Sequence, residues 1–298
     1  MTHSDGFLSA FTASNPLVIA EISSNHNQDL GRAQALVRAA AEAGANAVKF
    51  QLFELEKLFA PEVLEASPQH RSRKRWELPR NFVEPLAAEA HALGMSFGCT
   101  PFDLEAANFL EPHVDFFKIS SYELLWHDLL AVCGSSGKPV ILSTGMANES
   151  EVASGFTHLR DSGCSDIALL HCVSSYPAPR GETNLSAIRA LRERFKVPTG
   201  WSDHSHDPSV VRRAVHRWGA SILELHFDLE GEGFEADSGH CWLPHELAAL
   251  TQELRTDSEL DGNGVKQPTT SELSDVTWRA DPSDGLRPLL ELRSTLNL

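Results

Sequence analysis

The stretch from Val197 to Phe227, VPTGWSDHSHDPSVVRRAVHRWGASILELHF, decides the fold that this sequence predicts. Two short apolar runs, VPTG and SILEL, flank a span from Pro208 to Trp218 that is predicted to be a helix. If both runs are parallel strands joined by a crossover helix, their carboxyl ends lie side by side. His204 follows the first run and His226 follows the second, so we expect the two imidazoles to converge on one point.

Converging imidazoles indicate a site for a divalent metal ion. Such ions take imidazole nitrogen and carboxylate oxygen as ligands, and Asp203 and Glu224 lie close to the histidines in the sequence. Taken one at a time, His204 is better explained as a helix cap and His226 as a core histidine with satisfied hydrogen bonds. Their matched positions after consecutive strands favour a metal site for the pair.

The size and charge of the chain limit its class and its partners. Its 298 residues suffice for one large α/β domain or two smaller ones, and a mean hydropathy of -0.22 is ordinary for a soluble globular protein. A net charge of -16 argues against nucleic acid as a partner, because phosphate backbones are bound by clustered Lys and Arg. The one dense basic run, between Arg71 and Arg80, is either a solvated loop face or a phosphate clamp.

The cysteines and the N-terminus indicate the compartment. The five cysteines are odd in number and include no CxxC pair, which is typical of reduced thiols in a cytosolic protein. They are Cys99, Cys133, Cys164, Cys172 and Cys241. The N-terminus lacks a basic segment and a long apolar run, and no apolar span approaches membrane length. The sequence therefore predicts a cytoplasmic protein with no membrane contact.

Eight predicted strands alternate with eight predicted helices. The strands are residues 17–22, 46–51, 95–100, 114–120, 139–142, 166–172, 197–200 and 221–225. The helices are residues 30–44, 81–93, 103–110, 124–133, 149–159, 184–195, 208–218 and 244–254. This alternation predicts an α/β protein, a (β/α)8 TIM barrel over residues 17–255. A doubly wound sheet is the alternative, but the first turn reads SSNHNQD rather than GxGxxG.

Three segments fall outside the alternation. Residues 1–16 form an N-terminal extension, and residues 52–79 form a long excursion of the kind that is usually functional or lid-like. Residues 256–298 are polar and only weakly periodic. We expect them to form an irregular C-terminal tail that docks on the barrel or on a neighbouring subunit, and not a separate domain.

Polar residues stand at or near the carboxyl ends of the predicted strands, which is the active-site face of a TIM barrel. They are Glu21, Lys49, Thr100, Lys118, Ser143, His171, Ser202 and Glu224. A lysine at such a position binds phosphate or carboxylate as a point charge, or forms a Schiff base if its pKa is depressed. Two lysines among several hydroxyl donors favour an anion pocket. Taken singly, each hydroxyl is explained as a strand-end or turn residue.

Other residues near the same mouth add to this pocket. The turn Ser143-Thr144-Gly145 offers backbone N–H groups to an anion. Glu21 is a candidate acid or base. Tyr176 lies in the loop SSYPAPR, which two prolines stiffen, and it either holds a polar substrate or packs against the barrel.

Eight stretches together resemble the sialic acid synthase family, in colinear order from about Leu17 to Leu247. They are IAEISSNHNQDLGRA, AGANAVKFQ, TPFDLEAANFL, FFKISSYEL, GKPVILSTGM, LLHCVSSYPAP, WSDHSHD and ELHFDLE, of which GKPVILSTGM and the SDH…ExHF pair are specific. Members of that family condense phosphoenolpyruvate with an amino sugar such as N-acetylmannosamine. The resemblance implies a metal-dependent transferase of carbohydrate biosynthesis that releases phosphate and makes a 3-deoxy-2-keto sugar acid.

The resemblance also implies roles for individual residues. His204 and His226 would bind the divalent metal, Mn²⁺ or Mg²⁺. The residues that would bind phosphoenolpyruvate are Lys49, Thr100, Lys118, Ser121, Ser143 and Ser202. The acceptor sugar would contact Gln51 and Tyr176, and the residues expected to serve proton transfer are Glu21, Glu224 and Asp237. Family members of this kind are homodimers or higher homo-oligomers.

The sequence departs from the family pattern at several positions. Ser174 stands where an asparagine is common, and Leu225 stands between Glu224 and His226 where a lysine is common. The usual Asp-His pair is Asp237-Ser238 here, with a histidine, His240, two residues further on. The antifreeze-like C-terminal domain, whose arginine reaches the acceptor across a dimer, is lacking. We expect the tail to substitute for it, with Arg287 as the acceptor-binding residue and Arg279, Asp281 and Asp284 nearby.

Two other functions stay open. The first is a pyruvate-type aldolase that forms a Schiff base at Lys49 or Lys118. The second is a sugar-acid-binding barrel without turnover, which the altered positions Ser174 and Ser238 favour.

Overall fold

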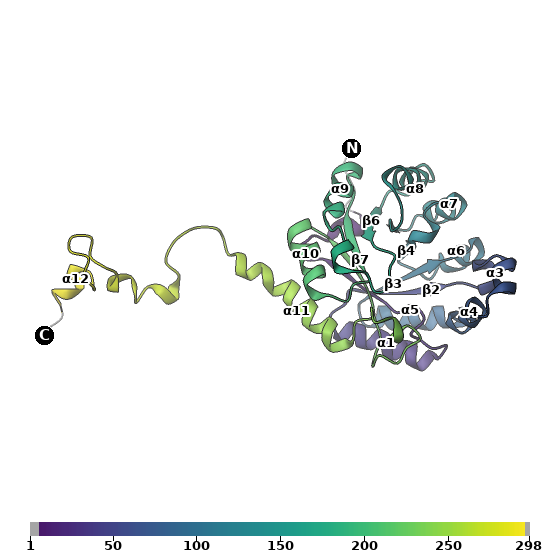
Figure 1. Ribbon diagram of the computed structural model, residues 1–298, viewed down its shortest axis with the longest axis horizontal. Coiled ribbons are helices and arrows are strands. Elements are labelled where there is room, and N and C mark those ends of the chain that lie inside the picture. Colours follow the sequence, from purple (N-terminus) through teal and green to yellow (C-terminus); the bar gives the residue numbers. More distant parts are fainter. Residues whose placement is uncertain (1–5, 296–298) are drawn as a thin grey trace. The chain divides into compact units, whose positions relative to one another are not determined.

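The computed structural model describes residues 6–295, except for the side chains of 257 and 258. Its strands are all parallel and close into a barrel in chain order, with β8 hydrogen-bonded to β1 (Figure 1). They are β1 (Leu17–Glu21), β2 (Ala47–Leu52), β3 (Ser96–Pro101), β4 (Phe116–Ile119), β5 (Val140–Ser143), β6 (Ile167–Cys172), β7 (Thr199–Asp203) and β8 (Ile222–His226). The predicted (β/α)8 barrel is confirmed.

A main helix follows each strand and covers the outside of the barrel. These helices are α1 (Leu30–Glu42), α5 (Val83–Ala92), α6 (Leu104–Leu110), α7 (His127–Ser135), α8 (Glu149–Asp161), α9 (Ser186–Phe195), α10 (Pro208–Trp218) and α11 (Pro244–Asp261). Local chemistry sets their ends. The Asp29 carboxylate accepts the backbone N–H of Arg32 at 2.8 Å and begins α1, and Gly219 ends α10 in the left-handed conformation.

Some predicted boundaries are wrong. Helix α7 begins at His127 rather than 124, because residues 124–126 continue the turn that starts in the 3-10 segment Ser121–Glu123, with the Trp126 N–H bonded to the Glu123 carbonyl at 2.9 Å. Helix α11 continues to Asp261, seven residues beyond the predicted end at Leu254. The apolar period stops at Leu254, but the residues that follow, which are mostly polar, include good helix formers such as Arg255, Glu259 and Leu260, which extend the helix.

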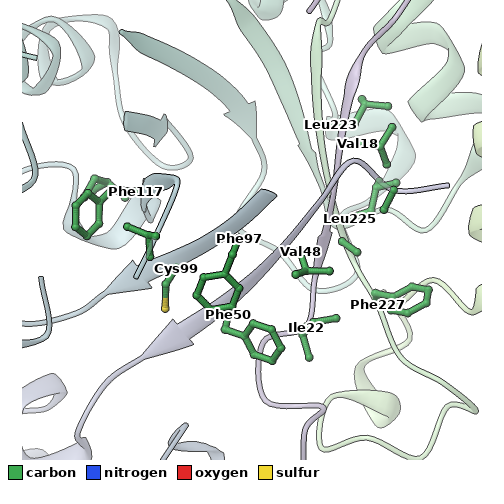
Figure 2. Packing of buried hydrophobic residues seen from close by; sticks show 14 of the residues in the cluster. Val18, Ile22, Val48, Phe50, Phe97, Cys99, Phe117, Leu223, Leu225 and Phe227 are labelled. Atoms are coloured by element: carbon green, nitrogen blue, oxygen red, sulfur yellow. The ribbon is translucent and has the colours of Figure 1, made fainter. Parts of the chain in front are cut away.

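Alternation along the strands separates two apolar clusters. Successive side chains point to opposite faces of a strand, so every second residue packs against the surrounding helices. Figure 2 shows this outer cluster, in which Val18, Ile22, Val48, Phe50, Phe97, Leu223, Leu225 and Phe227 are labelled. The inner cluster is made of Leu17, Ile19, Ala47, Phe116, Ile141, Ala168, Leu170 and Ile222. Leu8, which is fully buried, and Phe7 belong to the inner cluster too.

Two glycines let the inner cluster close. A Cβ at Gly200 would lie 2.0 Å from the carbonyl oxygen of Ile222, and one at Gly98 would lie 2.3 Å from the ring of Phe116. The barrel therefore fills its interior with large side chains on some strands and with no side chain on others.

The excursion after β2 forms short helical turns: α2 (Leu55–Leu58), α3 (Pro61–Ala66), α4 (Pro68–Arg71), and the 3-10 turns Ser72–Trp76 and Arg80–Phe82. Its cations face partners within or near the excursion. Lys74 pairs with Glu56 at 2.6 Å, Arg80 pairs with Glu54 at 2.8 Å, and Arg73 lies over the ring of Trp76. These contacts favour the loop-face interpretation of the basic run.

Clustering of contacts divides the chain into residues 1–256 and residues 257–298. In the second unit, 3-10 turns occupy Thr270–Glu272 and Val276–Trp278, and α12 occupies Leu290–Arg293. Arg293 forms a salt bridge with Asp284 at 2.6 Å. That the tail docks on the barrel or on a neighbour stays a prediction. Within the described residues, no helix is both long and apolar enough to cross a membrane, and the five cysteines form no disulfide.

Candidate active site

The inward side chains change from apolar to polar at the carboxyl ends of the strands. On six strands, the residue two positions after an inner-cluster residue is polar or a cysteine, and it is buried. These residues form a ring: Glu21, Lys49, Lys118, Ser143, Cys172 and Glu224. Two residues on from Gly98 and Gly200 are Thr100 and Ser202, which are also buried. The barrel therefore gathers most of the predicted strand-end residues in one place, at its mouth.

Lys49 stands between two carboxylates. Its Nζ lies 2.6 Å from Glu21 Oε2 and 3.8 Å from Glu224 Oε2, and it donates to Thr100 Oγ1 at 3.0 Å. Burial alone would lower the pKa of Lys49, but Glu21 and Glu224 raise it. Gln51 donates to the other oxygen of Glu21 at 2.6 Å. Lys49 is therefore a fixed positive charge on the floor of the mouth.

Lys118 has fewer partners. Its Nζ donates to the carbonyl oxygen of Ile119 at 2.9 Å and lies 3.9 Å from Glu224 Oε1. Burial lowers the pKa of Lys118 below its ordinary value. Burial alone would raise the pKa of Glu224, but Lys118 and Lys49 lower it to about 2. Ser202 donates to Glu224 at 2.9 Å, so this carboxylate stays charged between the two lysines.

A cradle of small polar groups lies beside the lysines. Gly145 N–H donates to Ser121 Oγ at 2.9 Å, and Ser121 Oγ lies 3.2 Å from Cys172 Sγ. A Cβ at Gly145 would lie 2.5 Å from Ser174 Oγ and 2.7 Å from Cys172 Sγ, so the backbone approaches these groups closely. Ser143 Oγ is buried and has no hydrogen-bond partner within residues 6–295. Its donor is free for an anion.

The two predicted metal histidines meet at the carboxyl ends of β7 and β8. The ring centroids of His204 and His226 are 5.3 Å apart. His204 Nδ1 lies 2.7 Å from the carbonyl oxygen of Val173, which leaves Nε2 available. Burial and His226 lower the pKa of His204 to about 3, so its imidazole is neutral, as a metal ligand must be. Tyr176 packs on this ring at 4.1 Å between centroids.

The loop between β8 and α11 adds donors that the sequence analysis did not assign. His226 Nδ1 lies 2.9 Å from Glu235 Oε2, and His240 Nε2 lies 3.7 Å from the same oxygen. Ligand atoms of His226, Glu235, His240 and Cys241 all lie within 4.8 Å of one another. The buried Nε2 of His240 has no hydrogen-bond partner. These residues fit a divalent metal ion. In the sequence, the occurrence of Glu, His and Cys within seven residues was the signal that could have identified them.

Some predicted residues lie elsewhere. Asp203 points outward from β7 and accepts the indole N–H groups of Trp201 and Trp242 at 2.9 and 3.2 Å, so it is a packing residue and its predicted place beside a metal is wrong. His171 also points outward, with Nε2 2.9 Å from the carbonyl oxygen of Thr183, because one position separates it from the inward Cys172.

Two further predicted residues, Asp237 and Arg287, form no hydrogen bond or ion pair with the described residues of the mouth, and Arg287 belongs to the second unit. Asp237 is exposed and forms no hydrogen bond or ion pair with any described residue, while Glu235, two positions earlier, points to the histidines. Arg287 is exposed in the second unit. The roles expected for both residues stay predictions.

A closed parallel barrel with two buried lysines, two buried carboxylates and a hydroxyl cradle at its carboxyl end defines a TIM-barrel enzyme that binds an anionic substrate. The model of the NeuB family matches residues 36–266, and this chain belongs to that family. It is thus a transferase of the sialic acid synthase type, which condenses phosphoenolpyruvate with a sugar. The predicted family resemblance is confirmed.

Three relatives illustrate the relationship. The chain is 34% identical to an N,N'-diacetyllegionaminic acid synthase of Campylobacter jejuni over 87% of this chain and 81% of that one. It is 32% identical to a pseudaminic acid synthase of Helicobacter pylori over 72% of this chain and 66% of the other. The crystal structure of an N-acetylneuraminic acid synthetase from Leptospira borgpetersenii superposes with a TM-score of 0.77 at 34% identity, covering 88% of this chain and 91% of that one.

Proposed function

We propose that this protein condenses phosphoenolpyruvate with the aldehyde of an N-acyl amino sugar or a related aldose, giving a 3-deoxy-2-keto sugar acid and phosphate. The observation that carries the proposal is the pair of buried lysines beside a hydroxyl cradle in which Ser143 Oγ has no hydrogen-bond partner among the described residues, since phosphoenolpyruvate carries a carboxylate and a phosphate on one small carbon frame. Lysine serves here as a charge clamp.

In the proposed reaction a bond forms between the methylene carbon of phosphoenolpyruvate and the aldehyde carbon of the acceptor. Water adds to the enol carbon, and phosphate leaves by cleavage of its C–O bond. Lys49, Lys118 and the hydroxyls of Thr100, Ser121, Ser143 and Ser202 hold the carboxylate and the phosphate throughout. Because they are fixed and buried before substrate binds, they stabilise developing charge without reorganising.

A carboxylate is available for each proton that moves. Burial raises the pKa of Glu21, although Lys49 opposes the increase, and we assign this residue to proton transfer. Glu224 keeps the two lysines charged and close together. A divalent metal, for which the family resemblance favours Mn²⁺ or Mg²⁺, would be held by His226 with His204 or with neighbouring donors, and would polarise the acceptor aldehyde as a Lewis acid.

The acceptor would enter over Gln51 and Tyr176. Tyr176 is 42% exposed and lies among the rings of His204, His226 and His240, which places a rigid aromatic hydroxyl beside the proposed metal. The named products of the relatives, legionaminic, pseudaminic and N-acetylneuraminic acids, favour an N-acyl amino-sugar acceptor. Asp237, Arg287, a homo-oligomeric assembly and a cytoplasmic location remain part of the proposal.

The test measures phosphate released from phosphoenolpyruvate across a panel of aldoses and N-acyl amino sugars, with Mn²⁺ or with a chelator. We expect release that needs both an acceptor and a metal. Release that the chelator leaves unchanged would contradict the metal requirement. Failure of phosphoenolpyruvate to bind at all would overturn the proposal.

A Schiff-base aldolase is the second candidate, and the environment of Lys118 favours it. Burial lowers the pKa of this amine, and its only hydrogen bond among the described residues is to a backbone carbonyl. Borohydride reduction in the presence of pyruvate separates the two mechanisms. A covalent adduct at Lys118 would support the aldolase, and its absence together with phosphate release would support the synthase.

Gly145→Ala is expected to raise the KM for phosphoenolpyruvate about tenfold or more, because the added Cβ must displace Ser121, Cys172 or Ser174. Gly181→Ala is the matched control, since nothing lies within 4 Å of the Cβ that it adds. Saturation curves for phosphate release measure both variants. An unchanged KM in Gly145→Ala would remove the cradle from the anion site.

A further inference from the structure

The loop between β8 and α11 holds a carboxylate, an imidazole and a thiol around His226. Glu235 Oε2 lies 2.9 Å from His226 Nδ1, 3.7 Å from His240 Nε2 and 4.0 Å from Cys241 Sγ. One carboxylate oxygen is therefore at the centre of three other potential ligands. His204 is not part of this group of four.

We propose that Glu235, His240 and Cys241 join His226 as direct ligands of one divalent transition-metal ion. The inference rests on the proposed function, because it names the ligands of the metal that the synthase reaction would use. Ligand atoms in a tetrahedral nitrogen and sulfur site lie roughly 3.4–3.8 Å apart, so the observed group, within 4.8 Å, needs only a small contraction.

The charges balance. A carboxylate and a thiolate with two neutral imidazoles cancel the two positive charges of the ion, which matters because the residues around it are mostly buried. Without a metal, Glu235 Oε2 faces His226 Nδ1 at 2.9 Å, so these two potential ligands already point at one another. The metal would displace the thiol proton of Cys241.

Hydrogen bonds from neighbouring residues orient the proposed ligands, as the residues behind the ligands do in known metal sites. Ser238 Oγ lies 2.7 Å from His240 Nδ1, so the other ring nitrogen, Nε2, faces the group, 3.7 Å from Glu235 Oε2 and without a hydrogen bond to any described residue. Ser23 donates to Glu235 Oε1, which turns Oε2 towards the histidines. Asn25 Oδ1 accepts the backbone N–H of Glu235 at 3.0 Å and holds the loop in place.

A thiolate ligand also predicts which ions bind. Sulfur ligands favour Zn²⁺, Co²⁺ and similar ions, and Mg²⁺ prefers oxygen. The site should therefore select Co²⁺ or Zn²⁺ strongly over Mg²⁺, in contrast to a site made of two histidines and water.

The test is titration of the full-length, chelator-treated protein with Co²⁺ in the absence of phosphoenolpyruvate. We expect a near-ultraviolet sulfur-to-cobalt charge-transfer band that Cys241→Ser abolishes and Cys164→Ser retains. Glu235→Gln and His240→Asn should weaken Co²⁺ binding about tenfold or more. Glu232→Gln, at an exposed carboxylate three positions from Glu235, is the matched control and should bind as the wild type does.

Two outcomes overturn the inference. In the first, Co²⁺ binds without the charge-transfer band, and this binding is lost in His204→Ala but unchanged in Glu235→Gln. That result would assign the metal to the two histidines alone. No Co²⁺ binding would make the group a hydrogen-bonding network that orders the loop. The wild-type spectrum alone decides whether sulfur is a ligand, even if a variant fails to fold. Because no substrate is present, failure here is separate from failure of the synthase reaction.

Discussion

Lys118→Met is expected to lower kcat/KM for phosphoenolpyruvate about 10²–10³-fold while the protein stays folded. Glu224, 3.9 Å from the Lys118 ammonium, keeps Lys49 and the Ser202 hydroxyl when Lys118 is replaced. Among the described residues, the only hydrogen bond of the ammonium is to the Ile119 carbonyl. Methionine of similar length fills the space without a buried charge. The expected decrease in kcat/KM therefore reflects the lost interaction with the substrate anion.

Phosphate release over a range of phosphoenolpyruvate concentrations measures this effect, and the midpoint of denaturant unfolding measures the fold. Lys196→Met removes an exposed lysine that follows α9 and should leave both quantities unchanged. Wild-type kcat/KM in Lys118→Met would show that this lysine does not contact the substrate. A large decrease in the unfolding midpoint would show that it is chiefly a structural residue.

The sequence predicts the barrel well because its signal is repeated eight times. Each strand is apolar, each is followed by an amphipathic helix, and the polar residue that ends a strand marks the mouth. Two predicted residues are assigned to the wrong face of their strand. His171 and Asp203 stand at strand ends, but each is one position away from an inward residue, Cys172 or Ser202. Periodicity locates the end of a strand more reliably than it assigns the face of a single residue.

The site beyond the strand ends could be predicted only in part. The loop from β8 to α11 has no period, so the sequence alone does not distinguish Asp237, which is exposed, from Glu235, which meets His226. The decisive contacts come from another loop: Ser23 and Asn25, after β1, hold Glu235 from more than 200 residues away. Such a pairing depends on barrel closure, since β1 and β8 become neighbours only then.

Lys49→Met is expected to decrease the free energy of unfolding by about 3–5 kcal/mol and to abolish turnover. Unlike Lys118, Lys49 is 2.6 Å from Glu21 and 3.8 Å from Glu224, all three side chains being nearly inaccessible to water. Removing the ammonium leaves Glu21 buried without its ion-pair partner, while Glu224 keeps Lys118 at 3.9 Å. The large stability change follows from that uncompensated charge and not from lost packing.

The double variant Lys49→Met, Glu21→Gln separates the structural role of Lys49 from its role towards the substrate. Glutamine removes the unpaired charge and still accepts the hydrogen bond from Gln51, so more than half of the lost stability should return. Turnover should stay absent, because the anion clamp is still missing. Denaturant midpoints and phosphate release measure the two effects. If the double variant were no more stable than Lys49→Met, uncompensated charge on Glu21 would not be the cause. If it regained turnover, Lys49 would act only by neutralising Glu21.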